Sequence, residues 1–225
     1  MKLSVIIPVY NEKRTILKIL KKVLEVPVEK EIIIVDDGST DGTKEILQSI
    51  NDERIKIIFK EKNEGKGTAI REGLKHITGD IVVIQDADLE YNPFDWLKMI
   101  EFIKEKKVDV VFGSRILGKN KKSSFVFHYG GKLVTFLTNL LYGTKLTDAP
   151  TCYKMVKKEI LDRINLKCKR FEFCQELTAK LRKRGYKIYE VPISYNPRSI
   201  REGKKIRWKD GIEAIWTLIK YKFID

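Results

Sequence analysis

The sharpest chemical signal in the sequence is Asp86-Ala87-Asp88, which follows the apolar run Ile81–Ile84 after one residue, Gln85. Residues i and i+2 of an extended segment point the same way, so both carboxylates lie together at the end of a predicted strand. Carboxylate pairs are hard oxygen ligands that suit Mg²⁺ or Mn²⁺. Glu90 continues the spacing and is a candidate third ligand. A solvated acidic turn would share this pattern. The position of Asp86-Ala87-Asp88 after a predicted buried strand favours a metal site instead.

A second acidic turn, Asp36-Asp37-Gly38-Ser39, closes the apolar run Ile32–Val35. Carboxylates in this position can accept hydrogen bonds from the imide of a base or from a ribose hydroxyl. A purely structural role would be ordinary turn chemistry. The two interpretations are compatible, and both place Asp36 and Asp37 at the end of a strand.

Polar residues also follow the first apolar run, Leu3–Ile7. Tyr10 offers an aromatic ring to a nucleobase, and Glu12 offers an acceptor for its N–H groups. Further along, Gly65-Lys66-Gly67 precedes a helical pattern, a setting that can cradle a phosphate. The chain has neither a Walker motif at Lys66 nor a GxGxxG after the first run, which argues against a P-loop or a dinucleotide-binding fold.

Alternating strand and helix patterns must position these residues. The expected strands are Leu3–Ile7, Ile32–Val35, Ile55–Phe59, Ile81–Ile84 and Val108–Phe112, and the expected helices are one capped by Asn11, Gly42–Ile50, Gly67–Ile77 and one from Pro93 to about Lys106. This alternation predicts an α/β fold with a mostly parallel sheet and helices on both faces. Sites in such sheets lie at the carboxyl ends of the strands, where the polar residues above gather.

The second half of the chain is less regular. It contains a basic loop at Arg115–Ser124, an apolar helical stretch at Phe125–Tyr142, a turn and strand in Thr147–Val156, a helix at Phe171–Arg184, a strand at Tyr186–Ile193, a basic loop at Ser194–Lys205 and a last helix at Trp208–Tyr221. We expect one domain over 1–225, with a nucleotide-binding half (1–113) and an acceptor-binding half (114–225).

Composition narrows the class of protein. The 225 residues carry 45 Lys+Arg against 31 Asp+Glu, a net charge of +14, and a 43% apolar fraction argues against disorder. The excess charge fits simple solubility, a nucleotide-phosphate substrate, nucleic acid or an anionic membrane surface. The longest uncharged apolar runs are too short for a membrane span or a signal peptide. Three cysteines without CxxC spacing argue against a disulfide framework and favour a reducing cytosol.

Several motifs together resemble the family 2 glycosyltransferases of GT-A fold. They are Ser4–Glu12, Ile34–Thr43, Gly65–Gly67 and Asp86–Glu90 in the first half, and Gly113–Arg115, Thr147-Asp148, Thr151–Lys154, Arg184–Tyr186 and Val191–Ile193 in the second. Within that family the chain looks most like the dolichyl-phosphate mannose synthase group, which moves a sugar from a nucleotide to a polyprenyl phosphate. The match covers nearly the whole chain.

The resemblance implies a role for each matching residue. Pro8, Tyr10, Glu12 and one of Asp36 and Asp37 would hold the nucleoside, with Lys66 near the phosphates; Asp86, Asp88 and Glu90 would hold Mg²⁺ or Mn²⁺; Arg115 would face the acceptor phosphate; and Arg198, Arg201, Lys204 and Lys205 would lie over the phosphates. The implied reaction is an inverting, metal-dependent sugar transfer from a UDP- or GDP-sugar to a polyprenyl phosphate.

The chemistry of the acceptor decides whether a base is needed. An ionised phosphate needs positioning rather than deprotonation, whereas a hydroxyl needs a carboxylate within hydrogen-bond reach. Asp148 is our candidate for a base or for orienting the acceptor, with Glu176 second. Phe125–Tyr142, preceded by lysines, predicts either a membrane-interface helix or one packed on the sheet, and the resemblance favours the interface. We expect a cytoplasmic enzyme bound peripherally to the inner face of the cell membrane.

Three other functions remain open at this stage. A family 2 enzyme acting on a non-lipid hydroxyl acceptor would share every donor-side residue. A nucleotidyltransferase would also use metal-bound carboxylates, but its usual basic glycine-rich loop is not found at Pro8–Glu12. A nucleic-acid-binding module would explain the charge but not the acidic strand ends, so we expect no nucleic-acid partner.

Overall fold

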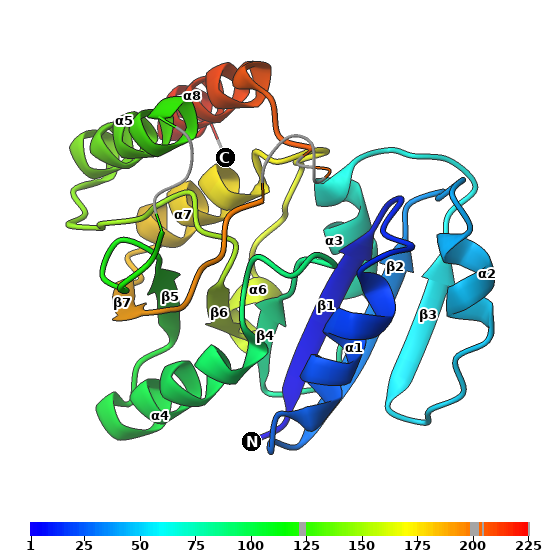
Figure 1. Cartoon of the computed structure of the whole chain (residues 1–225). Coiled ribbons are helices and arrows are strands. Elements are labelled where there is room, and N and C mark those ends of the chain that lie inside the picture. The colour runs from blue at the N-terminus through cyan, green and yellow to red at the C-terminus, as the bar shows by residue number, and fades with distance from the viewer. Residues whose placement is uncertain (122–124, 199–202, 204, 225) are drawn as a thin grey trace.

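The computed structural model describes residues 1–121, 125–198, 203 and 205–224. In this part of the chain, seven strands form one sheet in the order β3-β2-β1-β4-β6-β5-β7 (Figure 1). The strands are β1 (Leu3–Val9), β2 (Lys30–Asp36), β3 (Ile55–Phe59), β4 (Ile81–Ile84), β5 (Val110–Ser114), β6 (Lys154–Lys157) and β7 (Tyr189–Pro192). Only β6 runs antiparallel to its neighbours, so the predicted mostly parallel sheet is confirmed.

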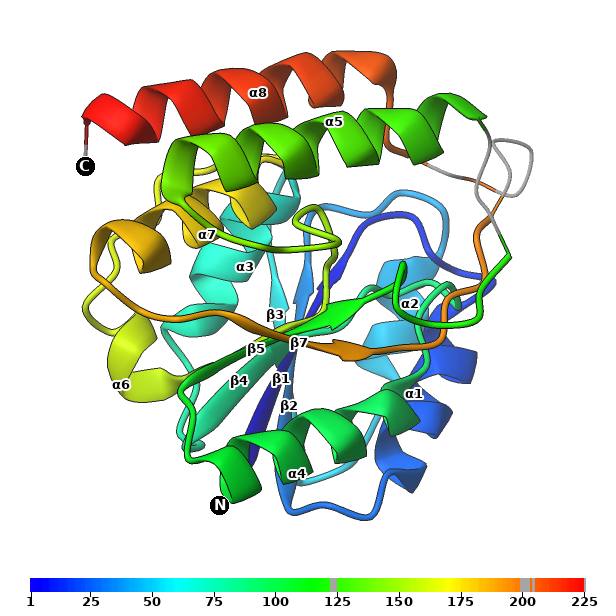
Figure 2. The ribbon, with the colours of Figure 1, turned by 90° about the vertical axis from the view of Figure 1, so that its left-hand side faces the viewer.

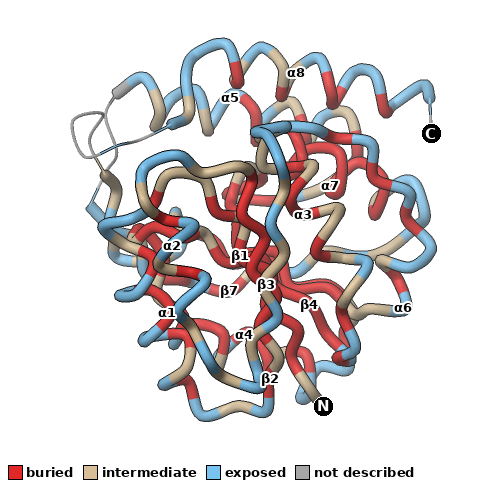
Figure 3. Tube along the Cα trace, turned by 90° about the vertical axis from the view of Figure 1, so that its right-hand side faces the viewer, coloured by how far each residue is buried: buried red, intermediate tan, exposed pale blue. Residues whose placement is uncertain are grey.

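Helices cover both faces of this sheet (Figure 2). On one side lie α1 (Ile16–Glu25) and α4 (Trp96–Lys106), the latter preceded by a short 3₁₀ turn, η1 (Pro93–Asp95), while the other side carries α3 (Lys66–Leu74), α6 (Lys158–Leu161) and α7 (Phe173–Lys183). The short α2 (Thr43–Gln48) connects β2 to β3. The buried residues follow the strands and the inner sides of these helices (Figure 3), which places the main core between the sheet and its two helical layers.

Two long helices form a further layer outside α7. They are α5 (Phe125–Tyr142) and α8 (Trp208–Phe223), which lie side by side in both views (Figures 1 and 2). A small second core joins them to α7 through Val134, Ala179 and Leu218. The hydroxyl of Tyr142 on α5 also donates to the carbonyl of Leu218 on α8 at 2.6 Å.

Parallel pairing explains why the polar strand ends meet. Val9 at the end of β1 pairs with Asp36 at the end of β2, and Ile6 pairs with Ile84 at the end of β4. The residues that follow β1, β2 and β4 therefore emerge at one edge of the sheet, as the sequence predicts.

Two boundaries differ from the expected ones for a local reason. The first helix begins at Ile16 rather than beside Asn11, because Asn11 has a left-handed backbone (φ 50°) and its side chain accepts from the Thr40 N–H at 2.8 Å. The fifth strand starts at Val110 rather than Val108, because Lys107 ends α4 in a left-handed conformation.

Candidate active site

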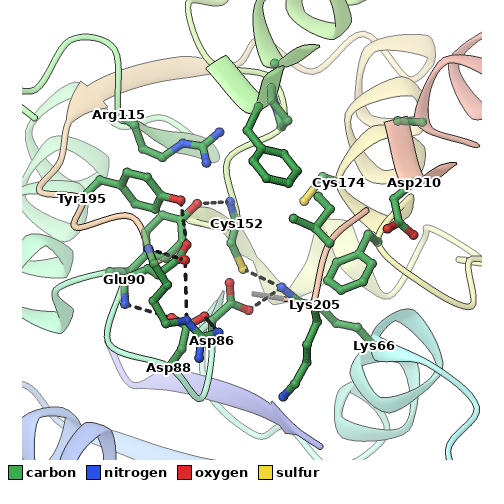
Figure 4. Close-up of a pocket in the computed structure, with 18 of the residues that line it drawn as sticks. Lys66, Asp86, Asp88, Glu90, Arg115, Cys152, Cys174, Tyr195, Lys205 and Asp210 are labelled. Atoms are coloured by element: carbon green, nitrogen blue, oxygen red, sulfur yellow. Dashed lines mark hydrogen bonds and ion pairs between the residues drawn. The ribbon is translucent and has the colours of Figure 1, made fainter. Parts of the chain in front are cut away.

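A cavity of about 1430 Å³ opens at the carboxyl edge of the sheet and extends between α5 and α8 (Figure 4). The predicted site residues that line it are Pro8, Tyr10, Glu12, Asp37, Lys66, Asp86, Asp88, Glu90, Arg115, Asp148, Arg198 and Lys205. The structure therefore brings the first-half motifs and the second-half basic residues into one place. Arg201 and Lys204 lie outside the described residues, so their predicted phosphate contacts stay predictions.

Asp86 is paired with the lysine of the glycine-flanked turn. Lys66 is the first residue of α3, and its ammonium group binds Asp86 and lies 3.4 Å from the Cys152 thiol. Burial alone would lower the pKa of Lys66, but the charge of Asp86 beside it raises that pKa well above its usual value. Gly65 allows this approach: it has φ +100°, and a Cβ there would come within 2.4 Å of the Lys169 carbonyl oxygen.

Asp88 binds a cation from the other end of the chain. Its Oδ2 accepts from the Arg198 guanidinium at 2.7 Å, and its Oδ1 accepts from the Glu90 N–H at 2.9 Å. Burial, together with the charges of Asp86 and Glu90, raises the pKa of Asp88 to about 7, although Arg198 opposes the shift. A second cation, Lys205, lies 2.7 Å from Glu12.

Glu90 holds the C-terminal basic segment in place. Its Oε2 accepts from the Tyr195 hydroxyl at 2.6 Å, and its Oε1 accepts from the Arg198 backbone N–H at 2.9 Å. This arrangement differs from the expected third metal ligand. Glu90 anchors the segment in this structure, and its part in metal binding stays a prediction.

The carboxylates after β4 are candidates to hold a divalent cation. Among the described residues, no three His, Cys, Asp or Glu side chains already surround a cation position. Instead, the ammonium of Lys66 and the guanidinium of Arg198 lie against Asp86 and Asp88. These two carboxylates offer only oxygen atoms as ligands, and each already has a cationic side chain against it. Oxygen ligands of this kind fit Mg²⁺ or Mn²⁺. Asp86 and Asp88 are the residues that would hold the ion.

The two carboxylates after β2 have different surroundings. Asp37 accepts from Lys60 at 2.6 Å and from the Gly65 N–H at 2.7 Å, so it fixes the loop before α3. Asp36 is fully buried, and its Oδ1 has no hydrogen-bond partner among the described residues. An unpaired buried carboxylate oxygen is costly, and such groups often mark functional positions. Of the two candidates, Asp36 has the free acceptor, whereas Asp37 lines the cavity.

Arg115 and Asp148 form a closed pair in the part of the cavity lined by the second half of the chain. The guanidinium donates through Nε and Nη2 to the two carboxylate oxygens, at 2.7 Å each, and the Arg115 backbone N–H adds a third bond at 2.9 Å. The ring of Tyr195 lies 5.0 Å from the guanidinium carbon. Both oxygens of Asp148 are thus engaged with Arg115, which favours the orienting role over that of a free base.

Glu176, the second candidate base, does not face the cavity. It is fully buried on α7, where it pairs with Lys180 at 2.8 Å and accepts from the Lys167 and Cys168 backbone N–H groups. Its bonds fix the segment that passes over the start of α3. The hypothesis that it acts as a base is therefore wrong.

Sequence reasoning missed several residues of the cavity. Tyr195 bridges Glu90 and the Arg115 side, and Arg170 reaches Asp210 on α8 at 3.3 Å. The sequence offered one signal for Tyr195, which stands three residues before Arg198 in the predicted basic loop. It offered none for Arg170.

Comparison with known proteins identifies the class of this fold and site. The chain matches the model of glycosyl transferase family 2 over residues 4–164. Because this match spans more than half of its length, the protein belongs to that family. The prediction of a family 2 glycosyltransferase is confirmed.

Among curated relatives, the dolichol-phosphate mannosyltransferase of Pyrococcus furiosus is 29% identical over 99% of this chain. The chain spans 65% of the length of that relative. An uncharacterized protein of Methanocaldococcus jannaschii is 30% identical over 97% of this chain and 91% of its own length.

Solved structures with the same fold include glucosyl-3-phosphoglycerate synthase from Mycobacterium tuberculosis. Its complex with uridine diphosphate gives a TM-score of 0.77 at 18% identity, covering 100% of this chain and 81% of that one. Its complex with Mn²⁺, uridine diphosphate and phosphoglyceric acid gives 0.76 at 19% identity, covering 100% and 79%. The predicted GT-A architecture is confirmed.

Proposed function

We propose that this protein is a metal-dependent, inverting glycosyltransferase that moves a sugar from a UDP- or GDP-sugar to a polyprenyl phosphate at a membrane surface. One observation carries the proposal: a single cavity joins the carboxylates at the sheet edge to Arg115 and continues between two helices with apolar outer sides. We further propose that residues 1–225 form one domain, whose halves 1–113 and 114–225 bind donor and acceptor.

The donor side rests on the carboxylates at the sheet edge. Pro8, Tyr10 and Glu12 line the part of the cavity that follows β1, where we place the nucleoside together with one of Asp36 and Asp37. The diphosphate would lie beside Asp86 and Asp88 through a divalent cation, with Lys66, Arg198 and Lys205 near its oxygens. The structural neighbour's complex with Mn²⁺ and uridine diphosphate supports this arrangement, as does the cationic charge already present at each carboxylate.

Charge explains how these residues would promote the reaction. The bond between the anomeric carbon and the diphosphate breaks while an acceptor oxygen bonds to the opposite face of that carbon. A bound divalent cation would neutralise charge on the departing diphosphate. Lys66, Arg198 and Lys205 supply further positive charge that is already oriented. An acceptor phosphate, with a second pKa of about 6, is largely ionised at neutral pH and needs only to be positioned.

Arg115 is the residue that we assign to this positioning. Its guanidinium is held in one plane by Asp148, and a fixed planar fork suits phosphate recognition. The relative named as a dolichol-phosphate mannosyltransferase supports a lipid acceptor.

The outer helices support contact with a membrane. We define the outer apolar face as the exposed apolar residues of α5 and α8: Val126, Tyr129, Leu133, Phe136 and Leu140, with Trp208, Ile212, Trp216, Ile219 and Phe223. Their spacing of three or four residues puts each set on one side of its helix. Exposed lysines at positions 132, 209, 220 and 222 lie on the same helices, as expected for an anionic lipid surface. Among the described residues, no helix is long and apolar enough to span a bilayer.

A transfer assay tests the proposal. The protein is incubated with UDP- and GDP-sugars, Mn²⁺ and a polyprenyl phosphate in detergent, and the lipid product is detected by mass spectrometry, with a chelator-treated sample as control. We expect lipid product that disappears on chelation. Transfer only to a soluble hydroxyl acceptor would instead support the alternative family 2 activity and contradict the lipid assignment.

A further inference from the structure

A carboxylate outside the cavity holds the turn that carries Asp148. Glu190 lies on β7, beside Phe112 of β5 in the sheet. Its Oε2 accepts from the Thr147 backbone N–H at 2.7 Å and from the Thr147 hydroxyl at 2.9 Å. Its Oε1 accepts from the Asp148 N–H at 3.0 Å. One side chain therefore fixes two consecutive residues of the turn.

The same turn is tied to the segment that carries Arg115. The hydroxyls of Ser114 and Thr147 are 2.7 Å apart. The Ser114 hydroxyl also accepts from the Ile116 and Leu117 backbone N–H groups, at 3.2 and 3.1 Å. Ser114 is fully buried. The residues on both sides of Arg115 are thus bonded to a network that ends at Glu190.

Asp148 completes the connection to the guanidinium. It is almost fully buried and binds Arg115 through three hydrogen bonds. Hydrogen bonds between ionised groups are strong and depend on geometry. A shift of the turn backbone would move the carboxylate and rotate the guanidinium with it.

From this chain of contacts, we infer that Glu190 is a positioning residue for the acceptor phosphate. It does not line the cavity, and it acts through the Thr147–Asp148 turn, whose Asp148 carboxylate sets the plane of Arg115. The inference rests on the proposed function, because it assumes that Arg115 binds the acceptor.

The charge of Glu190 matters as well as its shape. Three donors point at its two oxygens, which a carboxylate accepts without offering a donor of its own. A glutamine at this position would direct an NH₂ group at a backbone N–H. At least one of the three bonds would therefore be lost, although the side chain keeps its size.

The central test compares Glu190→Gln with wild type in steady-state transfer to farnesyl phosphate. We expect the KM for the acceptor to rise about 10- to 100-fold, the scale for misplacing a positioning group. The KM for the sugar nucleotide should change by less than about twofold, because Glu190 acts only through Arg115. A general loss of structure would instead raise the KM values of both substrates. Glu159→Gln, at an exposed ion-paired carboxylate on α6, is the matched control and should change neither value.

A spectroscopic readout makes the test independent of the reaction. In protein labelled with ¹⁵N-arginine, the Nε–H signal of Arg115 is assigned by its loss in Arg115→Lys. This signal reports the bond from Nε to Asp148. We expect Glu190→Gln to shift or broaden it, while Glu159→Gln leaves it unchanged. If wild type transfers nothing to farnesyl phosphate, the proposed function fails, and this signal still decides the role of Glu190.

A milder variant covers the case in which Glu190→Gln does not fold. Thr147→Val removes the hydroxyl bonds to Glu190 and Ser114 but keeps both backbone bonds, so it should raise the acceptor KM by a smaller factor. An unchanged Arg115 signal in folded variants, or equal rises in both KM values, would overturn the inference.

Discussion

The two sides of the cavity neutralise their charged residues in opposite ways. On the proposed donor side, Asp88 and Glu12 belong to the first half of the chain. The cations that pair with them, Arg198 and Lys205, come from the far end of the second half. On the proposed acceptor side, Arg115 and Asp148 lie in the same half, and Asp148 is held in turn by Glu190.

This difference shows which charges can be exchanged. A metal ion can replace Arg198 as the positive partner of Asp88, and a diphosphate can replace Asp88 as the negative partner of Arg198. The exchange therefore leaves no buried charge unpaired. Arg115 has no such replacement, because an acceptor phosphate brings only negative charge and would leave the almost fully buried Asp148 carboxylate unpaired if it displaced it. The donor side is arranged to exchange partners, and the acceptor side to stay fixed.

The largest effect should come from Asp88→Asn. Removing this carboxylate charge takes away one of two proposed metal ligands, so Mn²⁺ should no longer enhance binding of a nucleoside diphosphate. Transfer should fall by at least about 1,000-fold, since a metal ion contributes several kcal/mol of charge stabilisation. Thermal shift with UDP or GDP, with and without Mn²⁺, measures the first effect. Asp109→Asn, at an exposed carboxylate paired with Lys157, serves as control. Equal Mn²⁺-dependent stabilisation of wild type and Asp88→Asn would show that the metal assignment is wrong.

A smaller effect, confined to the acceptor, is expected for Arg115→Lys. An ammonium keeps the positive charge beside Asp148 but cannot bind both of its oxygens or present a planar fork. We expect transfer to polyprenyl phosphate to fall about 100-fold, while thermal stabilisation by Mn²⁺ and nucleotide stays close to that of wild type. If nucleotide binding weakens as much as transfer does, the two sides are not separate as proposed.

Arg198→Gln tests the exchange of partners directly. In wild type this guanidinium lies 2.7 Å from Asp88 and competes with any cation for its oxygen. Without that competitor, Mn²⁺ alone should bind about 10-fold more tightly, whereas the nucleotide should lose a contact and bind more weakly. Titration calorimetry with Mn²⁺, with nucleotide and with both measures the coupling between them. A coupling that is the same in wild type and variant would contradict the exchange.

The sequence was sufficient to locate the donor side. Apolar runs followed by acidic turns are local patterns, and parallel pairing brings the ends of such runs to one edge. That is why Asp36, Asp86, Asp88 and Glu12 could be placed near one another before the structure was known. The same logic explains why the fold class was predictable.

The ion pairs of the site could not be predicted in this way. Asp88 and Arg198 are 110 positions apart, and Arg115 and Asp148 are 33 apart. No periodicity records such contacts, because they depend on how the irregular second half folds over the sheet. The antiparallel strand β6 was only partly foreseen, since its four residues are too few to show a pattern. Glu190 was overlooked because its contacts with Thr147 and Asp148 are also distant in sequence, although it stands in a predicted strand.

The last and smallest expected effect concerns the outer apolar face and tests whether the side of the cavity that carries Arg115 also faces the membrane. Trp216 on α8 and Leu140 on α5 are 62% and 68% exposed. Moving an apolar side chain from water into the membrane interface stabilises binding by about 1–2 kcal/mol, so Trp216→Ser and Leu140→Ser should each weaken binding to anionic vesicles about 10-fold. Leu17→Ser, on α1 far from these helices and 53% exposed, should have no effect. Vesicle co-sedimentation at rising salt measures this, and wild-type binding should weaken with salt because lysines contribute through charge. If Leu17→Ser weakens binding as much as Trp216→Ser, or if neither helix variant does so, α5 and α8 do not form the lipid-facing surface.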